Sequence, residues 1–418
     1  MCFGSYKREL IVMENKIVRF GELYQIPSSN GLSRPSAVRG IGFKMINMGE
    51  LFANNIISDI PMERVQMSES EQKKFFVEQG DLLFARQSLV AEGAGKCSII
   101  KLFNEPTTFE SHLIRVRLNQ KIANPWYYYY LFQLKSNPIK AIINQCAQAG
   151  IRGSELARVK VPNPPLPTQQ KIASILSAYD NLIQNYKKQI EALQTTASEL
   201  YKEWFVRFRF PGWQTTNFEN GIPEGWSICR LKDFGKVITG KTPPTEKEEY
   251  YGGDVMFVKT PDMHGNMFVQ STSEYLSKLG CEYQKAQYLP ENSIMVSCIG
   301  TGGITAINAY PANTNQQINS IILKDKKYLP WLYFTISNMK ETIEMFGNTG
   351  TTMTNLSKGK FEKLKVVKPE HSIIQTFENK VSPLFEQIKN LNKQITNLTQ
   401  QRDLLLPRLM SGKLEVLK

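Results

Sequence analysis

Residues 172–204, IASILSAYDNLIQNYKKQIEALQTTASELYKEW, carry apolar side chains at alternating steps of four and three residues. The series is Ile172, Leu176, Tyr179, Ile183, Tyr186, Ile190, Leu193, Ala197, Leu200 and Trp204. A sustained period of about 3.5 residues is typical of a coiled-coil seam, because an isolated helix of period about 3.6 drifts off such a stripe. The stretch therefore predicts a long helix that packs against another helix.

The same pattern returns 205 residues further along the chain. The second series is Phe377, Val381, Leu384, Ile388, Leu391, Ile395, Leu398, Arg402, Leu405 and Leu409, in which Arg402 is the single polar break. Prolines 162, 164, 165 and 167 precede the first helix, and Ser372–Gln375 has the spacing of a capping box before the second. Pro383 should kink the second helix or delay its regular start. Two separate amphipathic helices, each on its own globular core, are the alternative.

The segments between these helices also resemble each other. GDLLFAR (80–86) aligns with ENSIMVS (291–297) as a hydrophobic strand, and NPWYYYYLF (124–132) aligns with LPWLYFTIS (329–337) as a helix after a proline start. AGIRGSELARVKVP (149–162) parallels TGTTMTNLSKGKFEKLKVVKP (349–369). We therefore expect an α+β chain whose two halves are an internal repeat. The expected parts are a globular domain at 1–160, a helix at 161–212, a second domain at 213–368 and a second helix at 369–418.

Helices of this kind would act as spacers. A helix of about 35 residues is ~50 Å long, and this length matches about 15 base pairs of duplex DNA. An antiparallel pair of such helices would give the chain a pseudo-twofold axis. Because a coiled coil is stiff, it could hold two DNA-reading modules at a fixed separation, which a flexible linker could not.

The charge of the chain favours a polyanionic partner. Fifty-one Lys and Arg against 38 Asp and Glu leave a formal charge of +13, which favours nucleic acid ahead of a membrane surface. A basic protein without such a partner is the alternative. The six cysteines include no C-x-x-C pair and suggest reduced thiols in the cytoplasm. No apolar stretch is long enough for a membrane span, the N-terminus lacks a signal peptide, and Met13 is a second candidate start.

Three short motifs suggest chemistry that their context does not support. GKVITGKT (235–242) matches a phosphate-binding loop, but Pro243 and Pro244 follow where the required helix should begin. Asn163-Pro164-Pro165-Leu166 lacks the aromatic residue with which adenine methyltransferases stack on a flipped base. Gly300–Gly303 lacks a following helix signal. The three histidines are too scattered for a multi-histidine zinc site, so we expect neither cofactor nor metal.

Four stretches of the chain together resemble the specificity subunit of Type I restriction–modification enzymes. Residues 225–263 look like the opening of a target-recognition domain in that family, including its G-x-TP loop at Gly240–Pro243. LYKEWFVRFRFPG (200–212) and LLLPRLMSGKL (404–414) look like the ends of its two conserved helices, and GTTMTNLSK (350–358) looks like the exit from a recognition domain. The matches occur in the order of the family and cover about residues 16–418.

The resemblance implies two mixed α/β target-recognition domains joined by two long conserved helices in an antiparallel coiled coil. It also implies a bipartite DNA target, two adenine-methylating modification subunits, motor-nuclease restriction subunits and no catalytic activity in this chain. The first domain departs from the pattern, because SSNGLSRPS (28–36) stands in place of a clear G-x-TP loop. Pro167-Thr168-Gln169-Gln170 also lacks the acidic residue that usually precedes the glutamine.

We expect the DNA contacts in or beside loops that contain Gly, Ser or Pro. The candidates are Arg34, Arg39, Lys44, Arg86 and Arg152 in the first domain, and Lys241, Thr242, Lys259, Asp262, Thr301 and Thr351 in the second. Arginine can bind guanine through two hydrogen bonds, and lysine can contact a phosphate. We expect Trp204, Phe205, Phe208 and Phe210 to pack in a core, with a docking patch as the alternative.

Two other functions are alternatives to a specificity subunit. A stand-alone sequence-specific DNA-binding regulator would purify without partner subunits. A DNA adenine methyltransferase would transfer methyl groups unaided, but the chain lacks the expected cofactor and base-stacking motifs.

Overall fold

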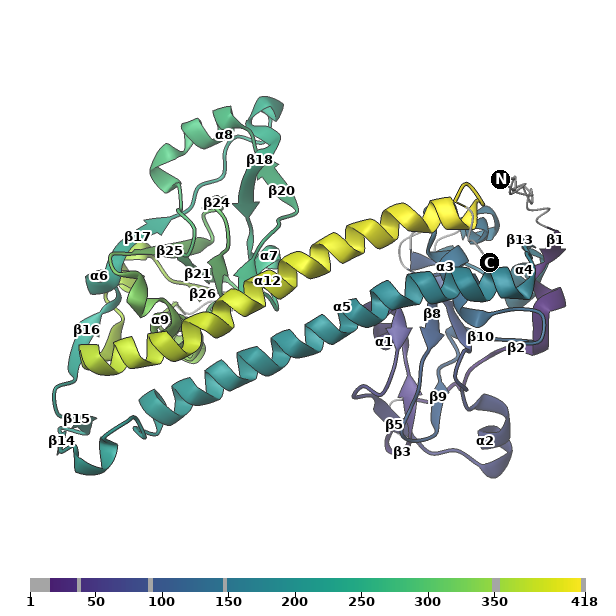
Figure 1. The fold of residues 1–418 in the computed structure, drawn as a ribbon, viewed down its shortest axis with the longest axis horizontal. Coiled ribbons are helices and arrows are strands. Elements are labelled where there is room, and N and C mark those ends of the chain that lie inside the picture. Colours follow the sequence, from purple (N-terminus) through teal and green to yellow (C-terminus); the bar gives the residue numbers. More distant parts are fainter. Residues whose placement is uncertain (1–15, 36–38, 89–92, 146–148, 348–353, 415–418) are drawn as a thin grey trace, which may run out of the picture. The chain divides into compact units, whose positions relative to one another are not determined.

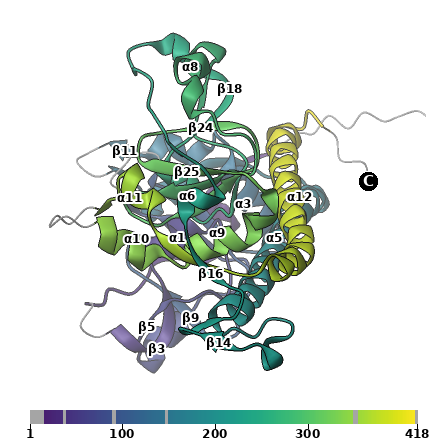
Figure 2. The same cartoon turned by 90° about the vertical axis from the view of Figure 1, so that its left-hand side faces the viewer.

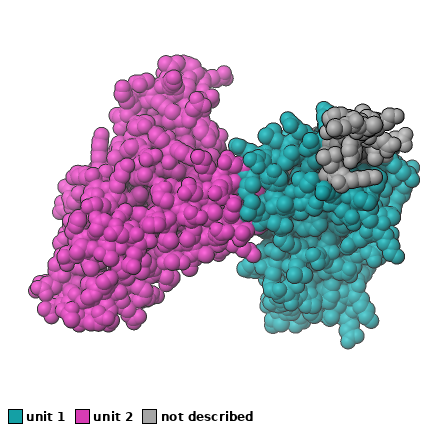
Figure 3. All heavy atoms as spheres, viewed as in Figure 1, with its two compact units in different colours: residues 1–182, 398–418 teal, residues 183–397 magenta. Residues whose placement is uncertain are grey.

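The computed structural model describes residues 16–35, 39–88, 93–145, 149–347 and 354–414 (Figure 1). The chain divides into two compact units, which are residues 1–182 with 398–418 and residues 183–397 (Figure 3). We call them unit 1 and unit 2. Helices α5 (Leu166–Tyr201) and α12 (His371–Met410) each contribute residues to both units. Within the described ranges, no helix combines the length and the apolarity that crossing a membrane requires.

Unit 1 is built on a five-stranded sheet in the order β2-β10-β6-β8-β4. These strands are β2 (Tyr24–Asn30), β10 (Leu113–Leu118), β6 (Leu82–Ala85), β8 (Cys97–Ile100) and β4 (Ile56–Ile57). Every residue of β6 and β8 is buried, because these strands are covered on both faces. A second sheet has the order β5 (Glu63–Val65), β3 (Arg39–Ile46), β9 (Thr107–Phe109).

Shorter elements complete unit 1. Strand β1 (Ile17–Arg19) pairs antiparallel with β13 (Lys160–Pro162), and β7 (Gln87–Ser88), β11 (Asn144–Gln145) and β12 (Ala149–Gly150) form a small sheet. The α-helices besides α5 and α12 are α1 (Met48–Ala53), α2 (Glu69–Phe75), α3 (Pro125–Gln133) and α4 (Gly153–Arg158). Four consecutive tyrosines in α3, residues 127–130, are buried in the core of this unit.

Unit 2 repeats the same topology. Its five-stranded sheet has the order β17 (Gly235–Thr239), β25 (Ile318–Leu323), β21 (Ile294–Ser297), β23 (Thr305–Asn308), β19 (Phe268–Val269). Its second sheet has the order β20 (Glu274–Leu276), β18 (Tyr251–Val258), β24 (Ala312–Thr314). Strand pairs β16 (Ser227–Arg230) with β27 (Lys365–Lys368), β22 (Ile299–Gly300) with β26 (Thr354–Asn355), and β14 (Phe218–Glu219) with β15 (Ile222–Pro223) complete it.

The short helices of unit 2 lie in separate places. They are α6 (Leu231–Phe234), α7 (Thr260–Met263), α8 (Lys278–Tyr283), α9 (Leu329–Ser337), α10 (Lys340–Gly347) and α11 (Lys358–Glu362). Helix α9 packs against α12 through the Phe334 and Phe385 rings, 5.9 Å apart. Helix α8 lies at the other end of the unit with β18 (Figure 2).

The strand registers confirm the internal repeat and correct one alignment. Leu82 of β6 faces Val116 in β10, and Ile294 of β21 faces Ile321 in β25. Leu82 is therefore equivalent to Ile294, whereas the aligned sequences matched it to Ser293. One residue of slip moves every side chain to the opposite face, so the structural register is the one that keeps the core apolar.

The predicted helices α3 and α9 are confirmed. Both begin with a proline in the first turn, Pro125 and Pro330, and the tryptophan that follows contacts neighbouring aromatic rings. Helix α4 followed by β13 likewise matches α11 followed by β27. Residues 349–353, at the start of the second aligned segment, lie outside the described residues.

The long helices pack on each other and on the globular cores. In unit 1, Ile172 and Leu176 of α5 share one core with Leu406 and Leu409 of α12. In unit 2, the Phe377 ring of α12 lies 5.8 Å from the Trp204 ring at the end of α5, as an antiparallel pair requires. The buried stripe is wider than a coiled-coil seam, because each helix also covers a sheet domain.

Three expectations about these helices have clear outcomes. Helix α12 begins at His371, so Pro383 does not delay its start, and Ser372 lies inside the helix rather than capping it. The predicted core packing of the aromatic cluster is confirmed, because Trp204 and Phe210 are buried in the core of unit 2. Phe205 and Phe208 pack against that core, and both contact Trp226.

Candidate nucleic-acid interface

Three loops of unit 2 meet where strands β17, β18 and β24 end. Gly240 follows β17, and the N–H of Lys241 donates to the carbonyl oxygen of Thr314 in β24 at 2.9 Å. A Cβ on Gly240 would lie 2.2 Å from the carbonyl oxygen of Asn315, so only glycine fits this crossing. The Thr242 hydroxyl donates to Gln316 from the same neighbouring loop. The loop is therefore a fixed surface feature.

The structure agrees with excluding a nucleotide-binding loop at 235–242. Strand β17 is followed by extended chain and a short 3-10 turn at Glu248–Tyr250, and no α-helix begins between residues 240 and 259. The phosphate donors that a helix N-terminus would supply are therefore missing from this described segment.

Lys241 is exposed, and its ammonium group lies over an aromatic ring. The Nζ atom is 4.2 Å from the ring centroid of Tyr283 in α8. Among the described residues, no carboxylate lies within ion-pair distance of Lys241. Its charge is thus held in place without a counter-ion.

Two of the other predicted DNA contacts in unit 2, Lys259 and Asp262, already interact with other residues of the protein. Lys259 forms an ion pair with Glu274. Asp262 accepts the N–H of Lys259 at 2.8 Å and that of Ser273 at 2.9 Å, so its carboxylate caps the start of α7. Thr301 is exposed in the loop after β22. Thr351 lies outside the described residues.

Unit 1 contains an equivalent of the Gly240 loop. The N–H of Leu32 donates to the carbonyl oxygen of Phe109 at 2.8 Å, and a Cβ on Gly31 would lie 2.0 Å from that oxygen. Gly31 is therefore equivalent to Gly240, within the SSNGLSRPS segment. The residue after the glycine differs between the units, because Leu32 is buried with Met45 and Val65 whereas Lys241 is exposed.

Three cations predicted as DNA contacts in unit 1 are paired with carboxylates. Arg34 pairs with Glu71, Arg39 with Glu63 at 2.7 Å, and Lys44 with both Asp59 and Glu105. A hydrogen bond from the Ser68 backbone and the contact with Arg34 lower the pKa of Glu71. Hydrogen bonds from Arg64 and Lys44 lower the pKa of Glu105. These ion pairs would compete with phosphate for the three cations.

Arg86 and Arg152 lie in neighbouring segments of unit 1 that are joined by a backbone hydrogen bond. Both are exposed. The Arg86 carbonyl accepts the N–H of Ile151, the residue before Arg152, at 2.9 Å. The Arg86 N–H donates to the carbonyl of His112 at 2.8 Å, and the Ser111 N–H donates to the carbonyl of Leu32 at 2.9 Å. Arg86 therefore lies close to the Gly31 loop.

Four residues of this region were not identified from the sequence. Gln316 and Gln317 are the loop after β24, and His112 is in the equivalent loop after β9. Tyr283 was also missed, because nothing near it in sequence links it to Lys241. A polar Asn-Gln-Gln run between two strands was the available signal for the glutamines.

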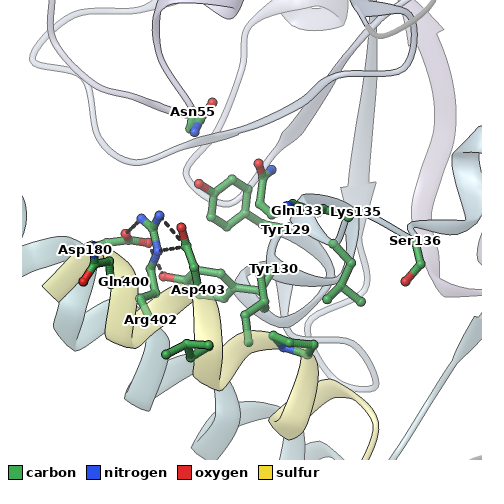
Figure 4. A pocket seen from close by; sticks show the side chains of 14 residues that line it. Asn55, Tyr129, Tyr130, Gln133, Lys135, Ser136, Asp180, Gln400, Arg402 and Asp403 are labelled. Atoms are coloured by element: carbon green, nitrogen blue, oxygen red, sulfur yellow. Dashed lines mark hydrogen bonds and ion pairs between the residues drawn. The ribbon is translucent and has the colours of Figure 1, made fainter. Parts of the chain in front are cut away.

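A cavity of about 770 Å³ lies in unit 1 between α3, α5 and α12 (Figure 4). Asp180 is buried there, accepting the Tyr130 hydroxyl at 2.6 Å and the Arg402 guanidinium at 2.6 Å. Burial lowers the pKa of Arg402, but hydrogen bonds to Asp180 and Asp403 outweigh burial and raise it. The polar break predicted at Arg402 is therefore a satisfied ion pair. Among the described residues, no cluster of His, Cys, Asp or Glu could hold a metal ion.

Comparison with known proteins gives consistent matches over nearly the whole chain. A family profile described as "Type I restriction modification DNA specificity domain" matches residues 14–195 and 223–400. The HindI specificity subunit of Haemophilus influenzae is 28% identical, over 88% of this chain and 94% of that protein. The MjaIX specificity subunit of Methanocaldococcus jannaschii is 33% identical over 69% of each chain.

A solved structure shares the fold. The S subunit of a Type I restriction–modification system from M. genitalium superposes with a TM-score of 0.59, covering 96% of this chain and 98% of that one. Its sequence identity is 14%, so the similarity concerns the fold.

Proposed function

Because the chain belongs to the Type I restriction–modification DNA specificity family, we propose that it recognises a bipartite DNA target within such a complex. The observation that carries this proposal is the repeated topology of the two units. Each unit carries the same glycine-fixed loop, with different side chains around it. Two similar scaffolds with dissimilar loops suit two dissimilar half-sites.

We assign the reading of DNA to the strand-end loops. Arg86 and Lys241 are the strongest of the predicted contacts, because each is exposed and lies at a fixed backbone position. Arg34, Arg39, Lys44 and Lys259 would first have to exchange a carboxylate for DNA. Arg152, Thr242, Asp262, Thr301 and Thr351 complete the proposed contacts. The target-recognition domains are proposed to span 1–160 and 213–368, and the helical segments 161–212 and 369–418.

The long helices support a spacing role in this proposal. Helix α5 has 36 residues and α12 has 40, and both contribute to each unit. We assign to this helical pair the gap between the half-sites and the docking of two modification subunits, with restriction subunits joining the complex. The chain itself would be non-catalytic and need no cofactor. A cytoplasmic location suits this role and the free cysteines 97, 229, 281 and 298.

Mapping methylated adenines in the host genome, with and without this gene, tests the proposal. We expect a two-part motif with a fixed gap that loses methylation when the gene is deleted. Complementation with a catalytically inactive modification subunit controls for unrelated methylation. Unchanged methylation in the deletion strain would refute the assigned role, and a single uninterrupted motif would refute the bipartite target.

Lengthening the helices tests the spacing role separately. Seven residues inserted into each helix keep the heptad phase and add ~10 Å, or about 3 base pairs of DNA. The methylated motif should keep both half-sequences and gain a longer gap. An unchanged gap, with the complex still active, would show that something other than the helices sets the spacing.

A further inference from the structure

The backbone before and after Lys241 is fixed on both sides. The crossing at Gly240 excludes any side chain, and the carbonyl oxygen of Pro243 accepts the Tyr251 hydroxyl at 2.8 Å. The side chain of Lys241 therefore projects from a fixed position of the backbone. A lysine side chain on a fixed backbone can still rotate about several bonds, so a further contact is needed to hold its ammonium group in one direction.

Tyr283 supplies that direction. Its ring lies under the Lys241 ammonium and stacks on the Tyr250 ring, with centroids 5.1 Å apart and an interplanar angle of 27°. The stack is anchored because the carbonyl oxygen of Tyr250 accepts the Ser277 N–H at 2.9 Å, at the start of α8. Tyr283 remains 42% exposed, so the cation above it is open to a ligand.

The charges of the described neighbours single out Lys241. Lys247 also lies over this stack, 5.3 Å from the Tyr250 ring centroid, but Glu246 and Glu248 flank it in the chain. Lys259 is paired with Glu274. A cation held on an aromatic platform with no carboxylate partner among the described residues is suited to bind an external anion.

At the equivalent position, the described part of unit 1 has an apolar residue in place of the lysine. Leu32 is equivalent to Lys241 and is 4% exposed, in a small apolar cluster against which Phe75 packs. Phe75 has the ammonium of Lys74, its neighbour in the same helix, 5.1 Å from its ring centroid, whereas the cation on Tyr283 comes from the glycine-fixed loop.

We propose that Tyr283 is a positioning residue that holds Lys241 against a phosphate of the DNA bound by unit 2. This inference rests on the proposed DNA-binding function. The contact is with the DNA backbone, so it adds affinity for any duplex and does not recognise the base sequence. The residue of unit 1 equivalent to Lys241 is the buried Leu32, which cannot make this contact, so the two half-sites would be held with unequal strength.

A double-mutant cycle with the full-length chain tests this role. Binding is measured by fluorescence anisotropy between about 50 and 200 mM salt, on a duplex with the methylated motif and on a scrambled duplex. Lys241→Gln should reduce the salt slope by about one and weaken both duplexes equally. Tyr283→Leu should weaken binding to both duplexes about two- to fivefold. Tyr283→Phe keeps the ring and should bind like the wild type. In the double variant, Tyr283→Leu should cost nothing beyond Lys241→Gln.

Matched controls separate the possible results. Lys247→Gln removes an equal charge from the same aromatic stack and should leave the salt slope unchanged. Additive losses in the double variant, or wild-type binding by Tyr283→Leu, would overturn the inference while leaving the DNA-binding function standing. A wild-type chain that does not prefer the motif would instead remove the proposed function. Circular dichroism verifies that each variant is folded.

Discussion

The two units meet the long helices with chemically different side chains at equivalent positions. In unit 1, Tyr130 and Arg402 both bind the buried carboxylate of Asp180. The equivalent positions in unit 2, 205 residues away in each case, are Thr335, Ala197 and Phe385. There Phe385 and Ala197 lie in an apolar core with Phe334. One backbone arrangement thus holds a buried ion pair at one site. At the other it holds an apolar core beside the Thr335 hydroxyl, which accepts the Tyr201 hydroxyl at 3.2 Å.

The difference means that the two sites should tolerate amino-acid substitutions to different degrees. A buried polar network is stable only when every member has its partner, because a buried charge without a partner is costly. An apolar core needs only matching shape. We therefore expect single substitutions to be far more disruptive in the polar network than their size suggests.

The largest expected effect comes from breaking the ion pair of unit 1. Arg402→Ala should lower the free energy of unfolding by about 3 kcal/mol, because the Asp180 carboxylate stays buried without its cation. The double variant Asp180→Phe/Arg402→Ala, which carries the residues of unit 2, should recover all but about 1 kcal/mol, the cost of an unpartnered Tyr130 hydroxyl. Urea denaturation followed by circular dichroism measures both.

The control for this experiment is Arg408→Ala, because Arg408 is exposed on the same helix. Its effect should stay within about 0.5 kcal/mol. If the double variant is no more stable than Arg402→Ala, the two sites are not interchangeable and the comparison fails.

An intermediate and equal effect is expected at the two loop glycines. Gly31→Ala and Gly240→Ala each place a Cβ about 2 Å from a backbone carbonyl oxygen, so each should cost about 1 to 3 kcal/mol. Differential scanning calorimetry would measure the loss. Gly49→Ala, at a helical glycine with open space around it, should be neutral or slightly stabilising. A loss in only one unit would show that the loops are not equivalent.

The smallest effect concerns two buried thiols among the described cysteines, Cys97 in unit 1 and Cys298 in unit 2. Burial raises the pKa of Cys298 in unit 2 to about 11 and raises that of Cys97 in unit 1. Because the thiolate is the reactive form, both should resist iodoacetamide near neutral pH, and Cys298 should react faster as the pH rises towards 11. Mass spectrometry after timed labelling measures this, with the half-buried Cys229 as the fast internal reference. Labelling of Cys298 as fast as Cys229 at pH 7 would contradict this assignment.

The sequence predicted the features that depend on periodicity. The two apolar series, the helices after Pro125 and Pro330 and the absence of a helix after Lys241 all follow from local rules. The partner of Arg402 could not be predicted, because Asp180 is 222 residues away in the chain. The equivalence of Gly31 and Gly240 was hidden for a similar reason, since it depends on how β9 and β24 lie beside the loops.

The surroundings of individual cations were the least predictable. Lys44 and Lys241 both lie close to glycine in the sequence, yet Lys44 is in strand β3 and is paired with two carboxylates, whereas Lys241 is in a loop and lies on an aromatic ring. Which of these occurs depends on residues brought in from other strands and helices, so the sequence near each lysine does not contain the answer.

Gly31 and Gly240 have a consequence for how such a protein can change over generations. Each glycine sets the path of the chain before the variable residue is reached, so the loop keeps its course whether the next residue is Leu32 or Lys241. A single nucleotide substitution can then alter what the surface offers to a ligand, with no insertion or deletion to accommodate. New preferences could accumulate in one half of the molecule while the other half stays as it was.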